Sequence, residues 1–284
     1  MPPTSPPSLR QQRLGAELRK LREHSGLTAT AAAELLGLKQ AQISGIETGR
    51  YAVGADRVRT LARAYSCADE KLVEALAAMT GGRVRGWWDD YREHLPVGLV
   101  DLAELEHHAS ALRVAIALHI PALLQTAAHA RAIFEDAATP FLPYELEHRL
   151  SYRIKRQEVL HRSGGLPYTA VIHEAALRMQ YGGPDVARAQ LAHIIEMSER
   201  DNVTVLVIPF ATRHFPGNGQ PFDYALGSVP QLDTVQVDTY HEGCEFLDAQ
   251  AQLAKYRNLL DRMEACALDP ARTRDFVHRL IQDL

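Results

Sequence analysis

The stretch LTATAAAELLGLKQAQISGIETGR, residues 27–50, decides the fold of the first part of the chain. It predicts two short helices, over residues 28–36 and 40–47, joined by a tight turn. Thr28 is a favourable N-cap because its hydroxyl can accept a hydrogen bond from an otherwise unpaired backbone N–H. Gly37 stands at the turn, where a left-handed backbone conformation costs least for glycine.

The second of these helices has an apolar face and an uncharged polar face. Ile43 and Ile46 are three residues apart, so both are expected to face the interior. The opposite face carries small or hydrogen-bonding groups, which could enter a major groove and contact base edges, as a glutamine amide does with adenine. Its residues are Gln40, Ala41, Ser44 and Gly45. The spacing alone equally allows a small solvated helix in an all-α bundle.

The longer segment LRKLREHSGLTATAAAELLGLKQAQISGIETGR resembles the helix-turn-helix of the Cro/C1-type (XRE) repressors. The resemblance covers about residues 10–78 and implies binding to double-stranded DNA. It also implies a charged pair that braces the domain from inside. By motif position this structural salt bridge would join Arg22 to Glu47.

Two positions depart from the pattern of that family. Ala29 stands where glutamine often follows the opening threonine, which removes one expected phosphate contact. Gly45 stands where a long polar residue is common; it costs about 1 kcal/mol of helix propensity relative to alanine and offers no side chain for readout. We therefore expect base readout to depend on Gln40, Ser44 and the shape of the DNA.

Phosphate contacts are expected from polar groups around the two helices. Arg50 follows Gly49 in a loop at the edge of the reading helix, where a side chain can meet the sugar-phosphate backbone. The complete set of expected phosphate contacts is Thr28, Lys39, Gln42, Thr48 and Arg50.

The surrounding patterns divide the chain into an arm, two domains and a linker. Residues 1–8, MPPTSPPS, are rich in proline and serine and predict a disordered arm. Residues 9–79 form an all-α, five-helix DNA-binding domain, and the Gly-containing segment 80–86 is the expected linker. Residues 87–284 then form a regulatory or dimerisation domain. The three further helices of the first domain are expected from Leu9 onward and over 56–64 and 69–79.

The distribution of charge fits this division. The 284 residues carry a net charge of −4, which by itself argues against a nucleic-acid binder. Residues 1–80, however, hold 11 Lys+Arg and 8 Asp+Glu, a net charge of +3, while the remainder holds 20 against 27, a net of −7. A mildly basic head on an acidic body is typical of a DNA reader attached to a domain that stays off DNA.

The remaining composition indicates a cytoplasmic protein. Three widely separated cysteines, Cys67, Cys244 and Cys266, lack metal-ligand spacing, and such sparse usage is typical of a reducing compartment. No stretch approaches the roughly 18 apolar residues that a membrane span needs, and no signal-peptide pattern is present. We therefore expect a cytoplasmic, nucleoid-associated protein with no membrane partner.

The second domain is predicted to be α+β with a small mixed sheet. After Gly165 the periodicity changes from helical to strand-like, and the apolar run 203–208 suits a strand covered on both faces. Strands are expected over 168–173, 203–208, 222–226 and 235–240. Helices are expected over 99–113, 119–137, 144–162, 185–200, 250–268 and 273–281.

Four segments of this half are similar to the large C-terminal domain of actinobacterial XRE-type regulators. They are LEHHASALRVAIALHIPALLQTAAHARAIF, RIKRQEVL, VIHEAALRMQYGG and QLAHIIEMSERDNVTVLVIPF. Ala122 departs slightly from the Pro-Gly usual in that family. The resemblance implies regulation of transcription by an antitoxin-like protein, often encoded beside a small partner protein. The C-terminal half would sense that partner or a small ligand.

Three arginines recur at helical spacing in YELEHRLSYRIKRQEVLHR and line up on one side of the expected helix. This stripe, Arg149, Arg153 and Arg156, could bind an anion or an acidic partner. Pairing with the local Glu147 and Glu158 is the more common arrangement.

No catalytic, metal or cofactor site is expected. His173-Glu174 lacks the second histidine of a zinc-protease helix, and no G-x-S-x-G motif is present. His241-Glu242-Gly243-Cys244 has no second pair of ligands nearby.

The sequence therefore predicts a DNA-binding transcriptional regulator. A homodimer on a two-fold operator is expected, because one small domain gives little specificity. Its C-terminal domain would be modulated by a small protein or a small-molecule effector. Two alternatives are an antitoxin-like protein whose main role is to sequester a small partner, and a repressor gated by a small molecule in an apolar pocket.

Overall fold

The computed structural model describes residues 6–80, 86–239 and 243–284. The chain divides into two compact units, Met1–Trp87 and Trp88–Leu284. Most of the expected linker and residues 1–5 of the expected arm lie outside the described residues. The arm is nevertheless shorter than predicted, because Ser8 is buried and caps the first helix in a capping box with Gln11.

The first unit is all-α and has five α-helices among its described residues. Its core holds one buried residue or more from each helix, including Leu18, Ala32, Ile43, Leu61 and Leu76. The helices are α1 (Leu9–His24), α2 (Ala29–Leu36), α3 (Gln40–Glu47), α4 (Ala55–Ala64) and α5 (Glu70–Ala78).

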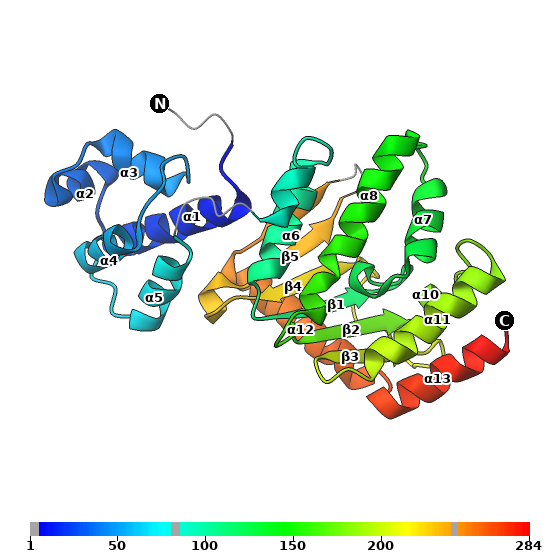
Figure 1. Ribbon diagram of the computed structural model, residues 1–284. Helices are drawn as coiled ribbons and strands as arrows, with labels where there is room; N and C mark the ends of the chain where they lie inside the picture. Colours follow the sequence, from blue (N-terminus) through cyan, green and yellow to red (C-terminus); the bar gives the residue numbers. More distant parts are fainter. Residues whose placement is uncertain (1–5, 81–85, 240–242) are drawn as a thin grey trace. The chain divides into compact units, whose positions relative to one another are not determined.

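The second unit combines helices with one mixed sheet (Figure 1). Its strands are β1 (Ala111–Ile116), β2 (Tyr168–His173), β3 (Val203–Ile208), β4 (Phe222–Leu226), β5 (Thr234–Asp238) and β6 (Cys244–Leu247). Its α-helices are α6 (Val97–His108), α7 (Ala127–Glu135), α8 (Pro143–Arg156), α9 (Glu158–His161), α10 (Glu174–Arg178), α11 (Pro184–Ser198), α12 (Gln250–Cys266) and α13 (Pro270–Gln282). Short 3-10 turns are η1 (Trp87–Tyr91), η2 (Ala122–Leu124) and η3 (Pro230–Leu232).

The strand order in the described residues is β3-β2-β1-β4-β5-β6. Strands β1, β2 and β3 are parallel, whereas β4, β5 and β6 add antiparallel pairs on the other side of β1. The chain thus runs outward from β1 in one direction and then returns to extend the sheet in the other. The carboxyl end of β1 is therefore the point where the strand order reverses.

Helices cover both faces of the sheet. Helix α12 covers one face, where Leu253 and Leu260 pack with Phe222 and Val235. Helices α11 and α13 lie against the other face, in a larger core that also receives residues of η2 and α9 (Figure 1). The expected fold class, an all-α helix-turn-helix unit followed by an α+β unit with a mixed sheet, is confirmed.

Two strands differ from the sequence prediction. The expected helix 99–113 is wrong at its end, because α6 stops at His108 and β1 occupies the centre of the sheet. Leu112 continues the apolar spacing of α6, but it belongs to β1, which lies between β2 and β4, whose residues are distant in the sequence. Strand β6 was not predicted, and only its pairing with β5 gives Cys244–Leu247 an extended structure.

Helix boundaries also differ in the middle of the chain. The expected helix 119–137 begins only at Ala127, where the Thr126 hydroxyl accepts a hydrogen bond from the His129 N–H. The expected helix 144–162 is divided at Gln157 into α8 and α9. No helix within the described ranges is long and apolar enough to cross a membrane.

Candidate nucleic-acid interface

Local signals fix the turn between α2 and α3. The Thr28 hydroxyl accepts a hydrogen bond from the Ala31 N–H at 3.1 Å and so caps α2. Gly37 ends the helix in the left-handed region, with φ of +63°. The Gln42 side-chain oxygen accepts a hydrogen bond from the Lys39 N–H at 2.9 Å, which closes the first turn of α3.

A buried ion pair joins α3 to α1. Arg22 Nε and Nη2 donate to the two carboxylate oxygens of Glu47 at 2.6 and 2.9 Å, and both side chains are more than nine-tenths buried. Arg22 Nη1 also donates to the Leu27 carbonyl at 2.7 Å. The hydrogen bonds and charge of Glu47 raise the pKa of Arg22, although burial opposes them. The pair thus holds α1, α3 and the segment that precedes α2 in one fixed arrangement.

Gly15 allows α1 and α3 to approach each other closely, and sequence reasoning did not single it out. A Cβ at this position would lie 2.5 Å from the Ile46 carbonyl oxygen and 2.6 Å from that of Glu47. The backbone of α3 therefore rests directly on α1, next to the ion pair. The spacing of glycine in LRQQRLGAELRK gave no signal of this contact because the partner lies 31 residues further along the chain.

The outer edge of α3 presents a hydrogen-bonded pair to solvent. Gln40 and Ala41 are exposed and Ser44 is half-buried. Gln40 Nε2 donates to the Ser44 hydroxyl oxygen at 2.9 Å. This bond orients the Gln40 amide, and it leaves the amide oxygen, one N–H of Gln40 and the Ser44 hydroxyl proton available to base edges.

Gly45 does not belong to this exposed edge, so its prediction as a base-reading position is wrong. It is buried, and a Cβ there would lie 2.2 Å from Cδ2 of the Tyr51 ring. The Tyr51 N–H also donates to the Gly45 carbonyl oxygen at 3.0 Å. Tyr51, which is itself 46% exposed, therefore covers α3 where a longer side chain would otherwise stand.

The five expected phosphate contacts are all exposed, but they differ in what they can donate. Lys39 and Arg50 have no side-chain partner in the described part of the chain. Gln42 keeps its amide N–H groups, since its oxygen caps α3. The Thr48 hydroxyl donates its proton to the Ser44 carbonyl at 2.8 Å, so it can only accept while that bond persists.

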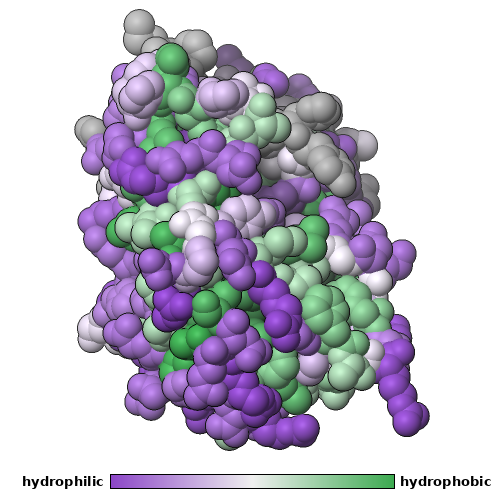
Figure 2. Space-filling model, turned by 90° about the vertical axis from the view of Figure 1, so that its right-hand side faces the viewer, coloured by the Kyte–Doolittle hydropathy of each residue, from purple (hydrophilic) through white to green (hydrophobic). Residues whose placement is uncertain are grey.

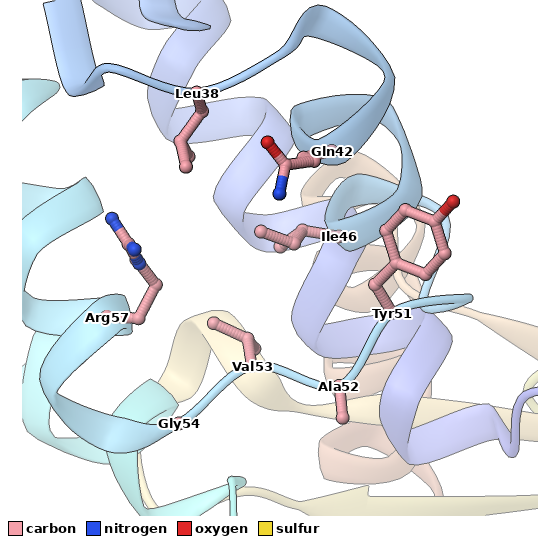
Figure 3. A pocket seen from close by; sticks show the side chains of 8 residues that line it. All are labelled: Leu38, Gln42, Ile46, Tyr51, Ala52, Val53, Gly54 and Arg57. Atoms are coloured by element: carbon pink, nitrogen blue, oxygen red, sulfur yellow. The ribbon is translucent and has the colours of Figure 1, made fainter. Parts of the chain in front are cut away.

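An open hollow lies between α3 and the start of α4 (Figure 3). Leu38, Ile46 and Val53 supply its apolar wall, and Gln42 and Arg57 face it from opposite sides. Arg57 is exposed and has no partner within residues 6–80, whereas its neighbour Arg59 is bound to Glu74 at 2.8 Å. Arg57 is thus a further cation beside α3 that the sequence gave no reason to choose.

Of the arginine stripe of α8, Arg156 is buried while Arg149 and Arg153 are half-buried, and the expected pairing with Glu147 and Glu158 is wrong. Glu147 pairs with Arg131, and Glu158 pairs with Lys155. Arg156 instead forms a buried, two-bond pair with Glu106 of α6, at 2.8 and 2.5 Å.

The other two arginines of the stripe lie over aromatic rings. The guanidinium carbon of Arg149 is 4.1 Å from the centre of the Phe141 ring, and that of Arg153 is 4.8 Å from the centre of the Phe134 ring. Within the described ranges no cluster of His, Cys, Asp or Glu could hold a metal ion.

Comparison with known families agrees with this geometry. Residues 13–76 match a family described as a helix-turn-helix domain, so the first unit is a helix-turn-helix domain of the DNA-binding kind. Residues 99–279 match a family described as a domain of unknown function, DUF5753. That match spans well over half of the chain, which therefore belongs to this family. No curated protein and no solved structure matches the chain.

Proposed function

We propose that this protein is a sequence-specific transcriptional regulator of the Cro/C1 (XRE) type, acting as a homodimer in the cytoplasm. The observation that carries the proposal is the solvent-facing Gln40–Ser44 pair on α3. Behind that pair, the Arg22–Glu47 ion pair and the close packing of α3 on α1 at Gly15 hold α3 in place. A stiff helix with an oriented amide at its outer edge is suited to reading base edges in a major groove.

The cations around α3 suit contacts with the DNA backbone. Lys39 and Arg50 lie at the two ends of the helix, and Arg57 lies across the hollow beside it. These exposed charges would add affinity for any duplex without adding sequence preference. The second unit is proposed to carry dimerisation and response to a small partner protein or ligand rather than catalysis.

The test begins with selection of duplexes from a random DNA pool by the full-length chain. A two-fold-symmetric site with half-sites about one helical turn apart is the expected product. Gln40→Ala should weaken binding to the selected site by about 1–3 kcal/mol and leave unrelated duplex unchanged. Arg50→Ala should weaken both and reduce the salt dependence by about one ion.

The matched control is Lys255→Ala, which removes one exposed charge from α12 in the second unit. It should bind the selected site as wild type does. Failure to enrich any sequence, or an equal loss on every duplex for Gln40→Ala, would refute the proposed readout.

A further inference from the structure

Arg153 is a half-buried cation whose guanidinium contacts no carboxylate among the described residues. Its Nη1 donates to the side-chain oxygen of Gln125 at 2.5 Å, and its Nε is buried with no hydrogen-bond partner. No carboxylate lies within ion-pair distance of it in the described part of the chain. Arg156, one turn further along α8, has both oxygens of Glu106. Charged groups removed from water are normally paired, so a guanidinium with a buried, unbonded Nε and no carboxylate partner is unusual.

Two histidines and a tyrosine accompany Arg153. His129 of α7 is 1% exposed, and neither of its ring nitrogens has a hydrogen-bond partner. Its ring meets the Tyr181 ring edge-on at 5.6 Å, and His119 stacks on the same tyrosine at 5.6 Å. Burial, His119 and Arg153 lower the pKa of His129 to about 4, so its ring is neutral at pH 7 and carries one N–H donor.

This group of side chains lies where the sheet reverses its strand order. His119 and Gln125 belong to the connection that leaves the carboxyl end of β1. The carboxyl ends of the three parallel strands β1, β2 and β3 meet at this edge of the sheet, which is the edge where open α/β sheets commonly bind ligands. His119 is exposed, so this end of the group meets solvent. An open hollow also borders Tyr181, and its lining includes Ala132 and Met179 together with the acidic Glu135 and Asp136.

The surface around this edge is partly apolar. Figure 2 views the molecule from the side toward which the arrows of β1 and β2 point in Figure 1, and apolar surface shows there between polar groups. Leu118, Met179 and Phe210 follow the ends of β1, α10 and β3 and are 54%, 41% and 60% exposed. A ligand with an apolar body could contact such a surface while its charged end points inward.

We propose that Arg153, His129 and His119 form a binding site for a small organic monoanion that carries a carboxylate on an apolar body. The planar guanidinium suits a carboxylate, which can accept from the free Nε as well as from a terminal nitrogen. A phosphate monoester is disfavoured because Arg153 is the one permanent cation of the group. Burial lowers the pKa of both histidines, and Arg153 lowers them further.

If the second unit responds to a small ligand, as proposed above, this site implies that the ligand is an organic carboxylate. Only this regulatory role rests on the proposed function; binding of the anion does not. The probe for the site itself is benzoate, titrated into the full-length chain at constant ionic strength and followed by NMR of isotope-labelled histidine rings. Benzamide, which has the same shape without the charge, is the control ligand. Benzoate should shift the His129 ring resonance saturably below about 50 mM, and benzamide should not.

The variant Arg153→Gln should weaken benzoate binding by about tenfold or more. Lys155→Gln removes the same charge from α8, where Lys155 pairs with the exposed Glu158, and should bind benzoate as wild type does. Equal shifts with benzamide, no shift with benzoate, or unchanged binding by Arg153→Gln would each overturn the site.

A second measurement does not depend on the probe. An unpaired, half-buried cation destabilises the free protein, so Arg153→Met should raise its melting temperature by a few degrees. A lowered melting temperature would mean that the contacts with Gln125 and Phe134 satisfy the guanidinium, and it would count against the site.

Failure of the site and failure of the proposed function can be told apart. If benzoate binds through Arg153 while Gln40→Ala weakens binding to all duplexes equally, the anion site is supported and the DNA-reading role is refuted. If the DNA-reading test succeeds while benzoate and benzamide behave alike, the regulator stands and the site falls.

Discussion

The ring of Tyr51 occupies the space that a side chain at position 45 would need. A Cβ on Gly45 would lie 2.2 and 2.4 Å from two ring carbons of Tyr51, and a backbone hydrogen bond joins the two residues. The Tyr51 ring can therefore take this position only because residue 45 has no side chain. This relationship explains why α3 tolerates glycine in its interior, where it costs about 1 kcal/mol of helix propensity.

This relationship predicts that Gly45→Ala changes the free energy of unfolding in opposite directions with and without the Tyr51 ring. Gly45→Ala in the wild type should lower the free energy of unfolding by about 1–2 kcal/mol, because the ring of Tyr51 must be displaced. In a Tyr51→Ala background the same change should raise it by up to about 1 kcal/mol, since only helix propensity remains. Hydrogen exchange of the α3 amides in the full-length chain resolves this region. The same sign in both backgrounds would contradict this relationship.

The Arg22–Glu47 pair predicts a large effect from a small change. Glu47→Gln keeps the shape but removes the charge, so the only anion left near the buried Arg22 among the described residues is the half-exposed Glu23 at 3.7 Å. The change should lower the free energy of unfolding by about 3 kcal/mol. The matched control is Glu74→Gln, which breaks the two-bond pair with Arg59 on the surface and should cost much less. Chemical denaturation of the full-length chain compares them. Equal losses would mean that burial of the Arg22–Glu47 pair has no energetic consequence.

The sequence predicted α2 and α3 to within a residue because their signals are local. Thr28 and Gly37 act on backbone groups within four residues of themselves. The cover over Gly45 could not be predicted, because it depends on how the chain turns back after Gly49, where φ is +70°. Helical periodicity indicates which side of a helix a residue lies on, but it does not show whether a later loop covers that side.

The same limit explains the second unit. Helical spacing correctly grouped Arg149, Arg153 and Arg156 on one side of α8, but it cannot tell a solvent face from an interior one. The partner of Arg156 is Glu106, 50 residues earlier on another helix. Strand β1 was hidden for a similar reason, since its Leu112 continues the apolar spacing of α6 and the partners of that residue lie in β2 and β4.

Asp223 predicts a loss of stability as pH rises. Burial, and then the charge of Glu106, raise the pKa of Asp223 from 3.8 to about 7, although Arg156 opposes them. Between these values the folded chain holds a proton that the unfolded chain has released, so stability falls with rising pH. Asp223→Asn should gain stability relative to wild type over this range, by at most about 1.4 kcal/mol per pH unit. A difference that is independent of pH would show that Asp223 ionises normally.

His129 predicts the opposite slope. Its pKa is lowered from 6.5 to about 4, so below pH 6.5 the unfolded chain binds a proton that the folded chain refuses, and stability falls as the pH falls. His129→Gln removes this effect and should gain stability relative to wild type from pH 6.5 down to about 4. The contributions of Asp223 and His129 oppose each other in that window. Urea denaturation gives the free energy of unfolding of each variant relative to wild type at each pH. Plotted against pH, this difference should change in opposite directions for the two variants. The same direction for both would contradict the burial of an uncharged imidazole at position 129.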